Sequence, residues 1–248
     1  MKKISLVVWL LGSIVHAQNT SFEQGNALYN SGDYNAAISK YEQILDNQKH
    51  SSELYFNLAN CYYKLNEVAP SIYYYEKALL LNPNDSDILN NLRFAKKMTI
   101  DTIGDLPTPG LVKLTNTMLS WFSGNQWAMV CVVLMLFFVL FFIAYYLTKK
   151  TKLKRLFFVL EGLVLVVMLV SFGLMTKKID LEQNLKHGIV FSKEVALKSE
   201  PNLKSDTVFL LHEGTKVQLI EVFQDSWTKI QLKDGKTGWL PNSTFKSL

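Results

Sequence analysis

Two long apolar runs joined by a short basic loop constrain this chain more than any other feature of its sequence. The first run covers residues 126–147 and the second covers residues 156–176. A helix needs about 20 apolar residues to cross the hydrocarbon core of a bilayer, and both runs meet that length. Trp127 and the Tyr145–Tyr146 pair flank the first run, as expected of side chains at membrane interfaces. Because the loop 148–155 is short, we expect an antiparallel two-helix hairpin in the membrane.

The distribution of charge predicts which way this hairpin faces. The chain has 26 basic and 21 acidic residues, a formal net charge of +5. The basic excess lies in the loop between the two runs, at Lys149, Lys150, Lys152, Lys154 and Arg155. Under the positive-inside rule this loop faces the cytoplasm. No other stretch concentrates Lys and Arg, so the sequence does not predict a nucleic-acid partner.

The first residues have the pattern of an export signal. Met1-Lys2-Lys3 precedes the apolar stretch Ile4–Val15, and Ala17 supplies the small residue of a cleavage site. The apolar stretch is too short to span a membrane comfortably. We therefore predict a signal peptide at 1–17. An uncleaved anchor is the alternative, because His16 is bulky for its position.

An internal repeat follows. Residues 25–38 align with residues 59–72 at an offset of 34 residues, and the second copy ends in Asn82–Asn84 with a helix-stopping proline. That period with helix-turn-helix patterning is typical of tetratricopeptide repeats. Small residues at equivalent positions would let the antiparallel helices approach: Gly25, Ala37, Ala59, Ser71 and Ala78. We predict an all-α domain at 20–98, with repeats at about 20–51 and 52–85 and a capping helix at 86–98. So short a solenoid leaves an end that needs a partner or a second copy.

Residues 99–125 link this domain to the membrane. Turn and breaker residues fill Ile100–Gly110 and predict a loop. Between Leu111 and Phe122 the apolar residues gather on one side of a helix, with Lys113 and Asn116 opposite. We interpret this segment as an amphipathic helix in the membrane interface. A helix packed on the repeats is the alternative.

After an expected linker at 177–187, the pattern changes to that of short strands. We predict strands at 189–191, 195–198, 208–211, 216–223, 227–232 and 237–240. Asp234-Gly235 predicts a two-residue hairpin turn between the last two. Residues 188–248 are therefore expected to form a small antiparallel barrel.

Four segments of this barrel resemble the bacterial SH3 domain: Val195–Pro201, Leu211–Val217, Trp227–Ile230 and Asp234–Leu240. The order of all the parts, from signal peptide to barrel, resembles the BatE family of the Bacteroides aerotolerance operon. That resemblance implies a non-catalytic component of an inner-membrane assembly. It also implies partners, namely membrane proteins with von Willebrand A domains and a cytoplasmic MoxR-type ATPase, and a role in tolerance of oxygen or envelope stress.

The expected fold is thus a multi-domain membrane protein. It consists of an all-α tetratricopeptide repeat domain, a two-helix transmembrane hairpin and an all-β SH3-like barrel. The signal peptide exports the first domain and the hairpin returns the chain to the same side. Both aqueous domains are therefore expected in the periplasm, anchored in the inner membrane and its lipid.

No catalytic or metal-binding pattern stands out. His16, His50, His187 and His212 are isolated, and phosphate-loop, dinucleotide and nucleophile-elbow patterns are absent from the sequence. Cys61 and Cys131 would lie in water and in lipid, so they cannot pair. We expect a non-enzymatic protein without catalytic residues, cofactor or metal.

The candidate binding residues lie in three places. The inner helices of the repeats would present a groove of Phe22, Asn26, Tyr29, Asn30, Phe56, Asn60, Tyr63 and Lys64. Such positions bind partner segments, although the asparagines could equally serve the repeat fold. In the barrel, the rims of Trp227 and Trp239 could form a peptide or glycan surface, but a role in the core alone is favoured.

The third candidate is Glu161, the ionisable residue inside the second apolar run. It could contact a partner helix or bind a proton, but we favour a side chain that reaches back to the cytoplasmic interface. Gly162 and Gly173 are expected to pack against the first span. Two functions lead: a scaffold that binds membrane proteins, or a cell-wall anchor or envelope sensor whose barrel binds peptidoglycan. A signalling receptor is a third option, disfavoured because only a short loop would face the cytoplasm.

Overall fold

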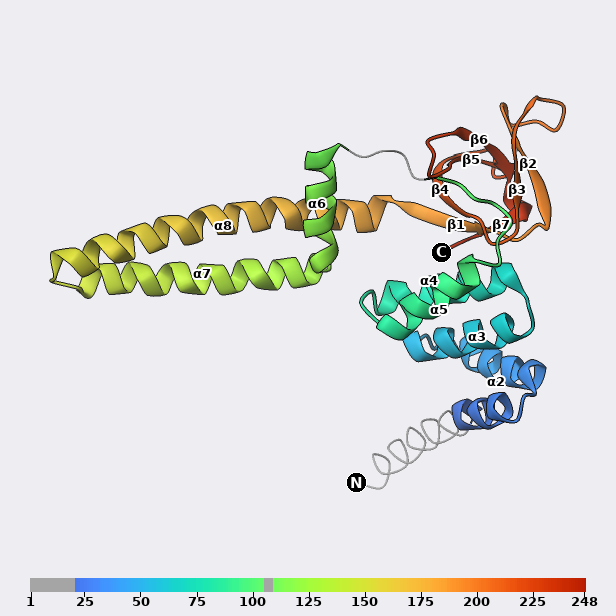
Figure 1. The fold of residues 1–248 in the computed structure, drawn as a ribbon, viewed down its shortest axis with the longest axis horizontal. Helices are drawn as coiled ribbons and strands as arrows, with labels where there is room; N and C mark the ends of the chain where they lie inside the picture. Colours follow the sequence, from blue (N-terminus) through green and yellow to red (C-terminus); the bar gives the residue numbers. More distant parts are fainter. Residues whose placement is uncertain (1–20, 105–108) are drawn as a thin grey trace, which may run out of the picture. The chain divides into compact units, whose positions relative to one another are not determined.

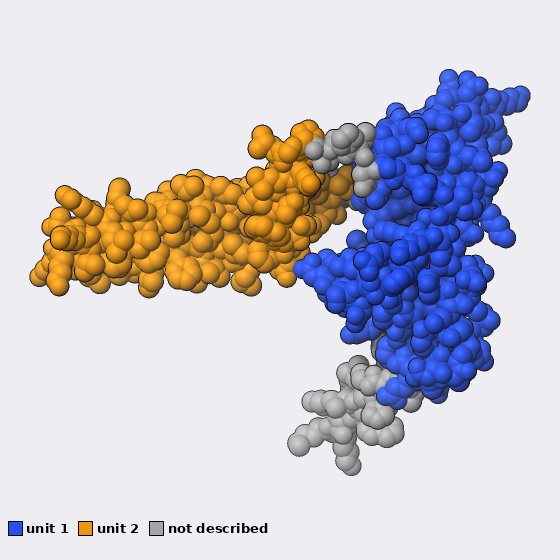
Figure 2. Space-filling model, viewed as in Figure 1, with its two compact units in different colours: residues 1–105, 186–248 blue, residues 106–185 orange. Residues whose placement is uncertain are grey.

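The computed structural model describes residues 21–104 and 109–248. Contacts divide the chain into two compact units (Figure 2). One unit holds residues 1–105 and 186–248, and the other holds residues 106–185. The signal peptide predicted at 1–17 lies outside the described residues.

The N-terminal part of the first unit is a stack of antiparallel helices (Figure 1). Residues 21–30 are helical, and they are followed by α2 (Tyr34–Asp46), α3 (Ser52–Lys64), α4 (Val68–Leu81) and α5 (Ser86–Lys96). Asp33, Ser51 and Asp85 each accept a hydrogen bond from a first-turn backbone N–H, which fixes where α2, α3 and α5 begin. The helical repeat domain is confirmed, and α5 is the expected closing helix.

Small residues let these helices approach, as the repeat pattern predicted. A Cβ atom added to Gly25 would lie 2.5 Å from a carbon of the Tyr41 ring. Ala37, Ala59 and Ala78 have no exposed surface. Larger side chains at these positions would separate the helices.

The C-terminal part of the same unit is an antiparallel barrel. Its strands are β1 (Lys186–Val190), β2 (Glu194–Lys198), β3 (Thr207–His212), β4 (Lys216–Phe223), β5 (Trp227–Gln231), β6 (Thr237–Pro241) and β7 (Phe245–Ser247). The order in the sheet is β3-β2-β6-β5-β4-β1-β7, and a 3-10 turn, η1 (Asn242–Thr244), precedes β7. Inward side chains such as Leu197, Leu211 and Ile230 form the core. The SH3-like sheet is confirmed. The short β7 was not predicted, because three residues carry too little alternation to signal a strand.

The turn between β5 and β6 differs from the prediction. Strand pairing continues to Gln231 and Thr237, and Leu232 N–H donates to Lys236 O at 2.9 Å. Three residues, 233–235, therefore form the turn, with Gly235 at φ +85°. Asp-Gly also suits this longer turn, since glycine readily adopts a positive φ.

The barrel covers the end of the repeat stack. Ile189 of β1 is fully buried in the hydrophobic core that α3, α4 and α5 build, and Phe191 and Leu248 pack against the same core. The rings of Tyr73 and Phe191 meet edge to face at 5.6 Å. The exposed end that we expected to need a partner or a second copy is therefore capped by the same chain.

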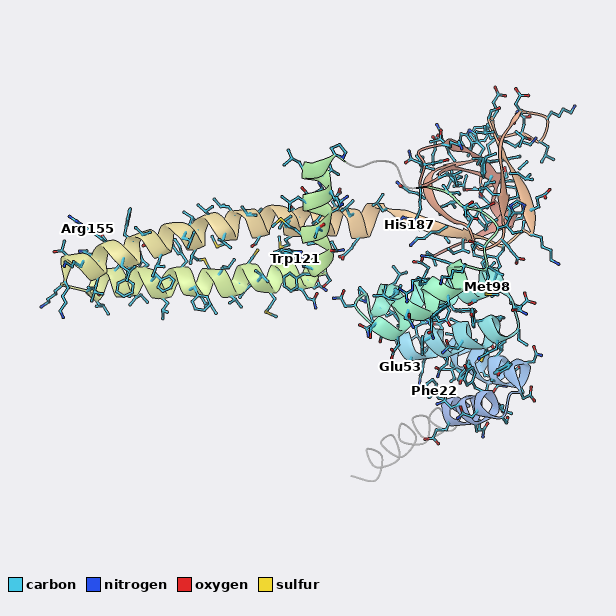
Figure 3. All side chains as sticks on the ribbon, in the orientation of Figure 1. Phe22, Glu53, Met98, Trp121, Arg155 and His187 are labelled. Carbon is cyan, nitrogen blue, oxygen red and sulfur yellow. The ribbon has the colours of Figure 1, made fainter. Side chains whose placement is uncertain are left out.

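The second unit contains α6 (Gly110–Trp121), α7 (Gly124–Leu147) and α8 (Thr151–Asn184). Helices α7 and α8 are both long and apolar enough to cross a membrane, by length and composition. They pack side by side as an antiparallel pair, and α6 runs across them (Figure 1). Trp121 lies at the end crossed by α6 and Arg155 lies at the opposite end (Figure 3).

The prediction of a linker at 177–187 is wrong. Helix α8 continues to Asn184 and β1 starts at Lys186. Hydropathy falls after Thr176, but a helix does not need apolar residues to continue. Lys178 and Glu182 form an (i, i+4) ion pair at 3.7 Å, and Leu181 packs on a cluster of unit 2 side chains.

Two expectations about the hairpin are also corrected. A Cβ atom added to Gly162 or Gly173 would meet nothing within 4 Å, so these glycines do not pack against α7. Trp127 is only 5% exposed and packs with Leu119 of α6 and Leu174 of α8 instead of standing out as an interfacial belt residue. Packing with α6 was not visible in the sequence of α7 alone.

Candidate functional site

The predicted groove residues come together only in part. Tyr29, Asn60, Tyr63 and Lys64 line a depression of about 190 Å³ on the inner helices. Tyr75, Asn91 and Phe94 complete its lining, although the repeat pattern did not place them in the groove. The available signal was spacing, because Asn91 follows Asn60 by the same interval at which Asn57 follows Asn26.

The asparagines of the groove belong to a hydrogen-bond network that occurs in both repeats. Asn26 Oδ1 accepts from Tyr41 Oη at 2.7 Å and from Asn57 Nδ2 at 3.0 Å. Asn60 Oδ1 accepts from the Tyr75 hydroxyl and from Asn91 Nδ2 at 3.0 Å. Each carbonyl oxygen is thus used to join helices. The side-chain amide nitrogen is the group that a ligand could engage.

Burial keeps the tyrosines of this network neutral. It raises the pKa of Tyr41 and of Tyr75 well above the ordinary value of 10.0. Their hydroxyls therefore stay protonated and donate to Asn26 and Asn60 at any physiological pH. Burial likewise raises the pKa of the Cys61 thiol to about 12, so this cysteine packs as an apolar side chain and is not a reactive thiolate.

The remaining groove candidates lie elsewhere. Phe22 packs on the Tyr41 ring at 5.8 Å and lines a separate depression with His50 and Leu54. Phe56 packs on Tyr75 at 6.0 Å, and Asn30 is exposed. The two phenylalanines thus serve packing between helices, whereas Asn30 is free to meet solvent or a partner.

On the barrel, Trp227 and Trp239 lie on the outer face. They alternate with the buried residues Thr228 and Leu240 along β5 and β6, so their side chains point away from the core. The Trp239 ring meets Phe223 edge to face at 5.9 Å, and Lys229 Nζ lies 5.8 Å from its centroid. The reading of both tryptophans as core residues alone is therefore wrong. Their neighbours in the sheet leave them half-buried at the surface.

A hollow of about 700 Å³ adjoins Trp227. Its walls come from the loop after β2, from Ser226 and from Pro241, and Leu203 on that loop is 76% exposed. Ser205 Oγ donates to Glu200 O and Asn202 O at 3.0 Å each, which holds the loop in shape. Apolar and proline side chains beside a tryptophan suit an extended peptide or a sugar face.

Glu161 lies partly exposed on α8. Within the part of the chain that the structure describes, no side chain forms a hydrogen bond or ion pair with it. Its proposed contacts with a partner helix or with the interface stay predictions. Among residues 21–104 and 109–248, no group of three or more His, Cys, Asp or Glu side chains could hold a metal ion.

Comparison with known families agrees with this architecture. Residues 22–87 match the model of the tetratricopeptide repeat, and residues 193–246 match that of the bacterial SH3 domain. The chain carries two interaction modules. A search among curated proteins gives no match. Both modules are typically non-catalytic and typically bind proteins or, for the bacterial SH3 domain, peptidoglycan.

Proposed function

We propose that this chain is a non-enzymatic adaptor of the bacterial inner membrane that binds membrane-protein partners through its repeat groove and its barrel. The observation that carries the proposal is that both modules form one compact unit on a chain with a two-helix hairpin. Two interaction modules that are packed together and anchored at a membrane can hold different partners close to each other, which is what a scaffold does. The function requires no cofactor.

The orientation rests on the basic loop. Arg155 and its neighbouring lysines lie at the end of the hairpin opposite Trp121 (Figure 3). The positive-inside rule keeps this end in the cytoplasm. Because the chain crosses the membrane twice, the segments before α7 and after α8 are on the same side, which we assign to the periplasm.

Helix α6 supports this placement of the membrane. It crosses the hairpin near the point where α7 begins and where α8 changes from apolar residues to Lys177 and Lys178. Its Leu119 packs into the hairpin cluster, whereas Leu111, at 82% exposed, and Leu114 face outward. We therefore propose that α6 lies at the periplasmic surface of the inner membrane, in the interface between lipid and water. Lipid would cover its exposed apolar side chains.

A depth measurement tests the position of α6. We expect a nitroxide attached at Leu114 to collide more with oxygen, which concentrates in lipid, than with a water-soluble nickel chelate. The same label at Asn116, on the polar side, should show the reverse preference. The comparison uses the full chain in lipid nanodiscs with Cys61 and Cys131 replaced. Equal accessibility of both labels to the nickel chelate would rule out an interfacial helix.

The identity of the partners rests on the order of the parts. Repeats, hairpin and barrel follow one another as in the BatE family of the aerotolerance operon. We therefore propose membrane proteins with von Willebrand A domains as partners, and a role in tolerance of oxygen or envelope stress. Amide and aromatic groups around Asn60 and Tyr63 would hold a segment of such a partner.

Site-specific cross-linking in intact cells tests the scaffold. A photo-reactive amino acid at Tyr63, inside the groove, should give adducts with another membrane protein. The same group at Ser39, an exposed position on α2, should give none. The adaptor proposal fails if neither position gives an adduct and the chain is recovered from gently solubilised membranes as a lone monomer.

The outward position of Trp227 and Trp239 favours a second candidate, an anchor that binds peptidoglycan. Aromatic rings at the surface can stack on sugar faces. The two functions share one architecture and differ in what the barrel binds. Peptidoglycan binding should be tested on the full chain and not on the isolated barrel. A fragment that starts at Gly188 would cut into β1 and would lack the repeats against which Ile189 is buried.

Cell-wall pelleting of the full chain in detergent micelles decides this candidate. If the barrel binds peptidoglycan, Trp239→Ala should weaken pelleting about tenfold or more, as expected for a tryptophan at the centre of an interface. Leu210→Ala, at an exposed position on β3, should leave pelleting unchanged. Failure of the wild-type chain to pellet would remove the cell-wall reading and leave the adaptor.

A further inference from the structure

Three cationic side chains gather at one end of the repeat groove. Lys64 ends α3 and lines the groove depression, and Arg93 and Lys97 lie one turn apart at the end of α5. The two helices meet there, since Asn91 Nδ2 of α5 donates to Asn60 Oδ1 of α3 at 3.0 Å. All three cationic residues are exposed. This end of the groove is therefore basic.

The positive charge of this end has no acidic partner. Arg93 Nη2 donates to Asn90 Oδ1 at 2.7 Å, but an amide oxygen carries no net charge. Within residues 21–104 and 109–248, neither Arg93, Lys64 nor Lys97 forms an ion pair. In the described part of the chain, no Asp or Glu lines the depression either. The three charges are thus available to an anion from outside.

Acidic residues on the neighbouring elements do not cancel this charge. Glu67, the acidic residue nearest to Lys64 in the chain, is exposed and forms no ion pair with it. Asp87 lies in the first turn of α5, at the opposite end of that helix from Lys97. Glu76 of α4 is buried and already paired with two lysines of its own. A positive excess remains even if Glu67 is counted against it.

Phe94 lies between two of the cations. It is 42% exposed, and its ring centroid is 5.8 Å from Arg93 Cζ and 5.2 Å from Lys97 Nζ. An aromatic ring attracts cations to its face, so both cations are kept beside it. An apolar side chain that packs on Phe94 would therefore bring its flanking residues close to both positive groups.

The depression beside Phe94 suits one such side chain. Its volume of about 190 Å³ is below the roughly 300 Å³ at which pockets for whole small molecules begin. The rings of Tyr29, Tyr63 and Tyr75 give it apolar walls. Asn60 Oδ1 is used between helices, which leaves the Asn60 amide nitrogen to donate to the backbone of a bound segment.

We propose that the groove selects an extended partner segment in which an apolar side chain is flanked by acidic side chains. This inference rests on the proposed function, which assigns a partner to the groove but no sequence to that partner. The apolar side chain would fill the depression, and the carboxylates would accept charge-assisted hydrogen bonds from Arg93, Lys97 and Lys64. Three separate cations suit more than one carboxylate, which a chain terminus alone does not supply.

Fluorescence anisotropy with short labelled peptides tests the selection on the full chain in zwitterionic nanodiscs. Three peptides, blocked at both ends, place a leucine between glutamates, glutamines or lysines, and a fourth ends in a free carboxylate after leucine without acidic side chains. We expect the glutamate peptide to bind about tenfold more tightly than the glutamine peptide. The lysine peptide should bind most weakly, and the fourth should resemble the glutamine peptide.

Salt provides an internal control, because the cations are exposed. At about 1 M salt the Debye length is only about 3 Å, so the advantage of the glutamate peptide should nearly vanish. Equal binding of the glutamate and glutamine peptides at low salt would overturn the proposal. Tighter binding of the fourth peptide than of the glutamate peptide would also overturn it, in favour of a chain terminus.

Variants locate the binding. Replacing both cations beside the ring, Arg93→Gln with Lys97→Gln, should weaken glutamate-peptide binding about fivefold, and Arg93→Glu with Lys97→Glu should reverse the preference toward the lysine peptide. Lys193→Glu with Lys246→Glu changes the charge equally at exposed positions on the barrel and should change nothing. Thermal unfolding checks that each variant is folded; if the glutamate variant is not, the glutamine variant decides. Unchanged binding by the folded glutamine variant would contradict the proposal.

Cross-linking from Tyr63 in intact cells separates this inference from the proposed function. We expect the adduct with the partner to decrease severalfold when Arg93 and Lys97 are both replaced by glutamine. If the wild-type chain gives the adduct and the double variant gives it undiminished, the adaptor stands and the acidic selection is wrong. Absence of the adduct from the wild-type chain would instead count against the adaptor, while the peptide comparison still decides the selection.

Discussion

Replacing Glu76 with glutamine should lower the free energy of unfolding of the first unit by about 2 to 4 kcal/mol, because removing one partner of a buried ion pair leaves the others uncompensated. Glu76 links α4 to Lys96 of α5 and to Lys216 of β4, so the change weakens the contact between repeats and barrel. The expected loss is moderate, since both lysines retain some exposure and can regain water. Urea unfolding of the full chain in detergent micelles, followed by tryptophan fluorescence, measures it.

Glu67→Gln is the matched control. Glu67 precedes the same helix, is exposed and makes no side-chain capping bond, so its replacement should change stability by less than about 0.5 kcal/mol. Equal unfolding curves for Glu76→Gln and Glu67→Gln would show that the buried pair does not hold the modules together.

Acidity should weaken the same contact. Lys216 and Lys96 lower the pKa of Glu76 against the opposing effect of burial. Hydrogen bonds from Thr215 and His212 likewise lower the pKa of Asp101 against burial. A carboxyl with a lowered pKa in the folded state stabilises the fold above its unfolded pKa and loses that contribution as the pH falls through the folded value. The stability of the wild-type chain should therefore decline below the ordinary values of 4.5 and 3.8.

The acid profile of Glu76→Gln separates the two carboxyl groups. Its stability should fall less steeply with acid than that of the wild type, because glutamine has no proton to gain. A variant curve that runs parallel to the wild-type curve over the whole acid range would contradict this assignment. The measurement is the urea midpoint as a function of pH.

An arginine in place of Val166 should have the second large effect, a loss of stable membrane insertion by α8. Val166 is an exposed residue near the middle of the apolar part of this helix. A charge at the centre of a span costs about 2.5 to 3.5 kcal/mol on insertion scales, which corresponds to roughly a hundredfold shift. Alkaline extraction of membranes, with a reporter fused after Leu248 to record the side reached, measures the outcome.

Leu153→Arg provides the control for this prediction. Leu153 was expected in the loop 148–155, but α8 begins at Thr151 and places Leu153 in its first turn, among the basic residues, where a long cationic side chain can reach the interface. Insertion and orientation should survive this change. If Val166→Arg were also tolerated, or if a reporter at Lys152 were found outside the cytoplasm, the two-span topology would be wrong.

The sequence alone determined the parts of the chain whose signals are local. Two apolar runs set the spans, a period of 34 residues set the helical repeats, and alternation with turn residues predicted most strands of the barrel. Each of these signals depends on neighbours a few residues apart, such as the (i, i+4) faces of a helix or the two faces of a strand. The wrong prediction of a linker at 177–187 also has a local cause, because hydropathy falls after Thr176 although helix α8 continues to Asn184.

Only the tertiary structure decided how these parts meet. Glu76 and Lys216 are 140 residues apart in the sequence, and no periodicity connects them. The same holds for Ile189 in the core of the repeats, for Trp127 beneath α6 and for the residues that complete the groove. Local patterns specify which face of an element is apolar but not which distant element covers it. That choice depends on shape and charge complementarity between folded surfaces, which exist only once the chain has folded.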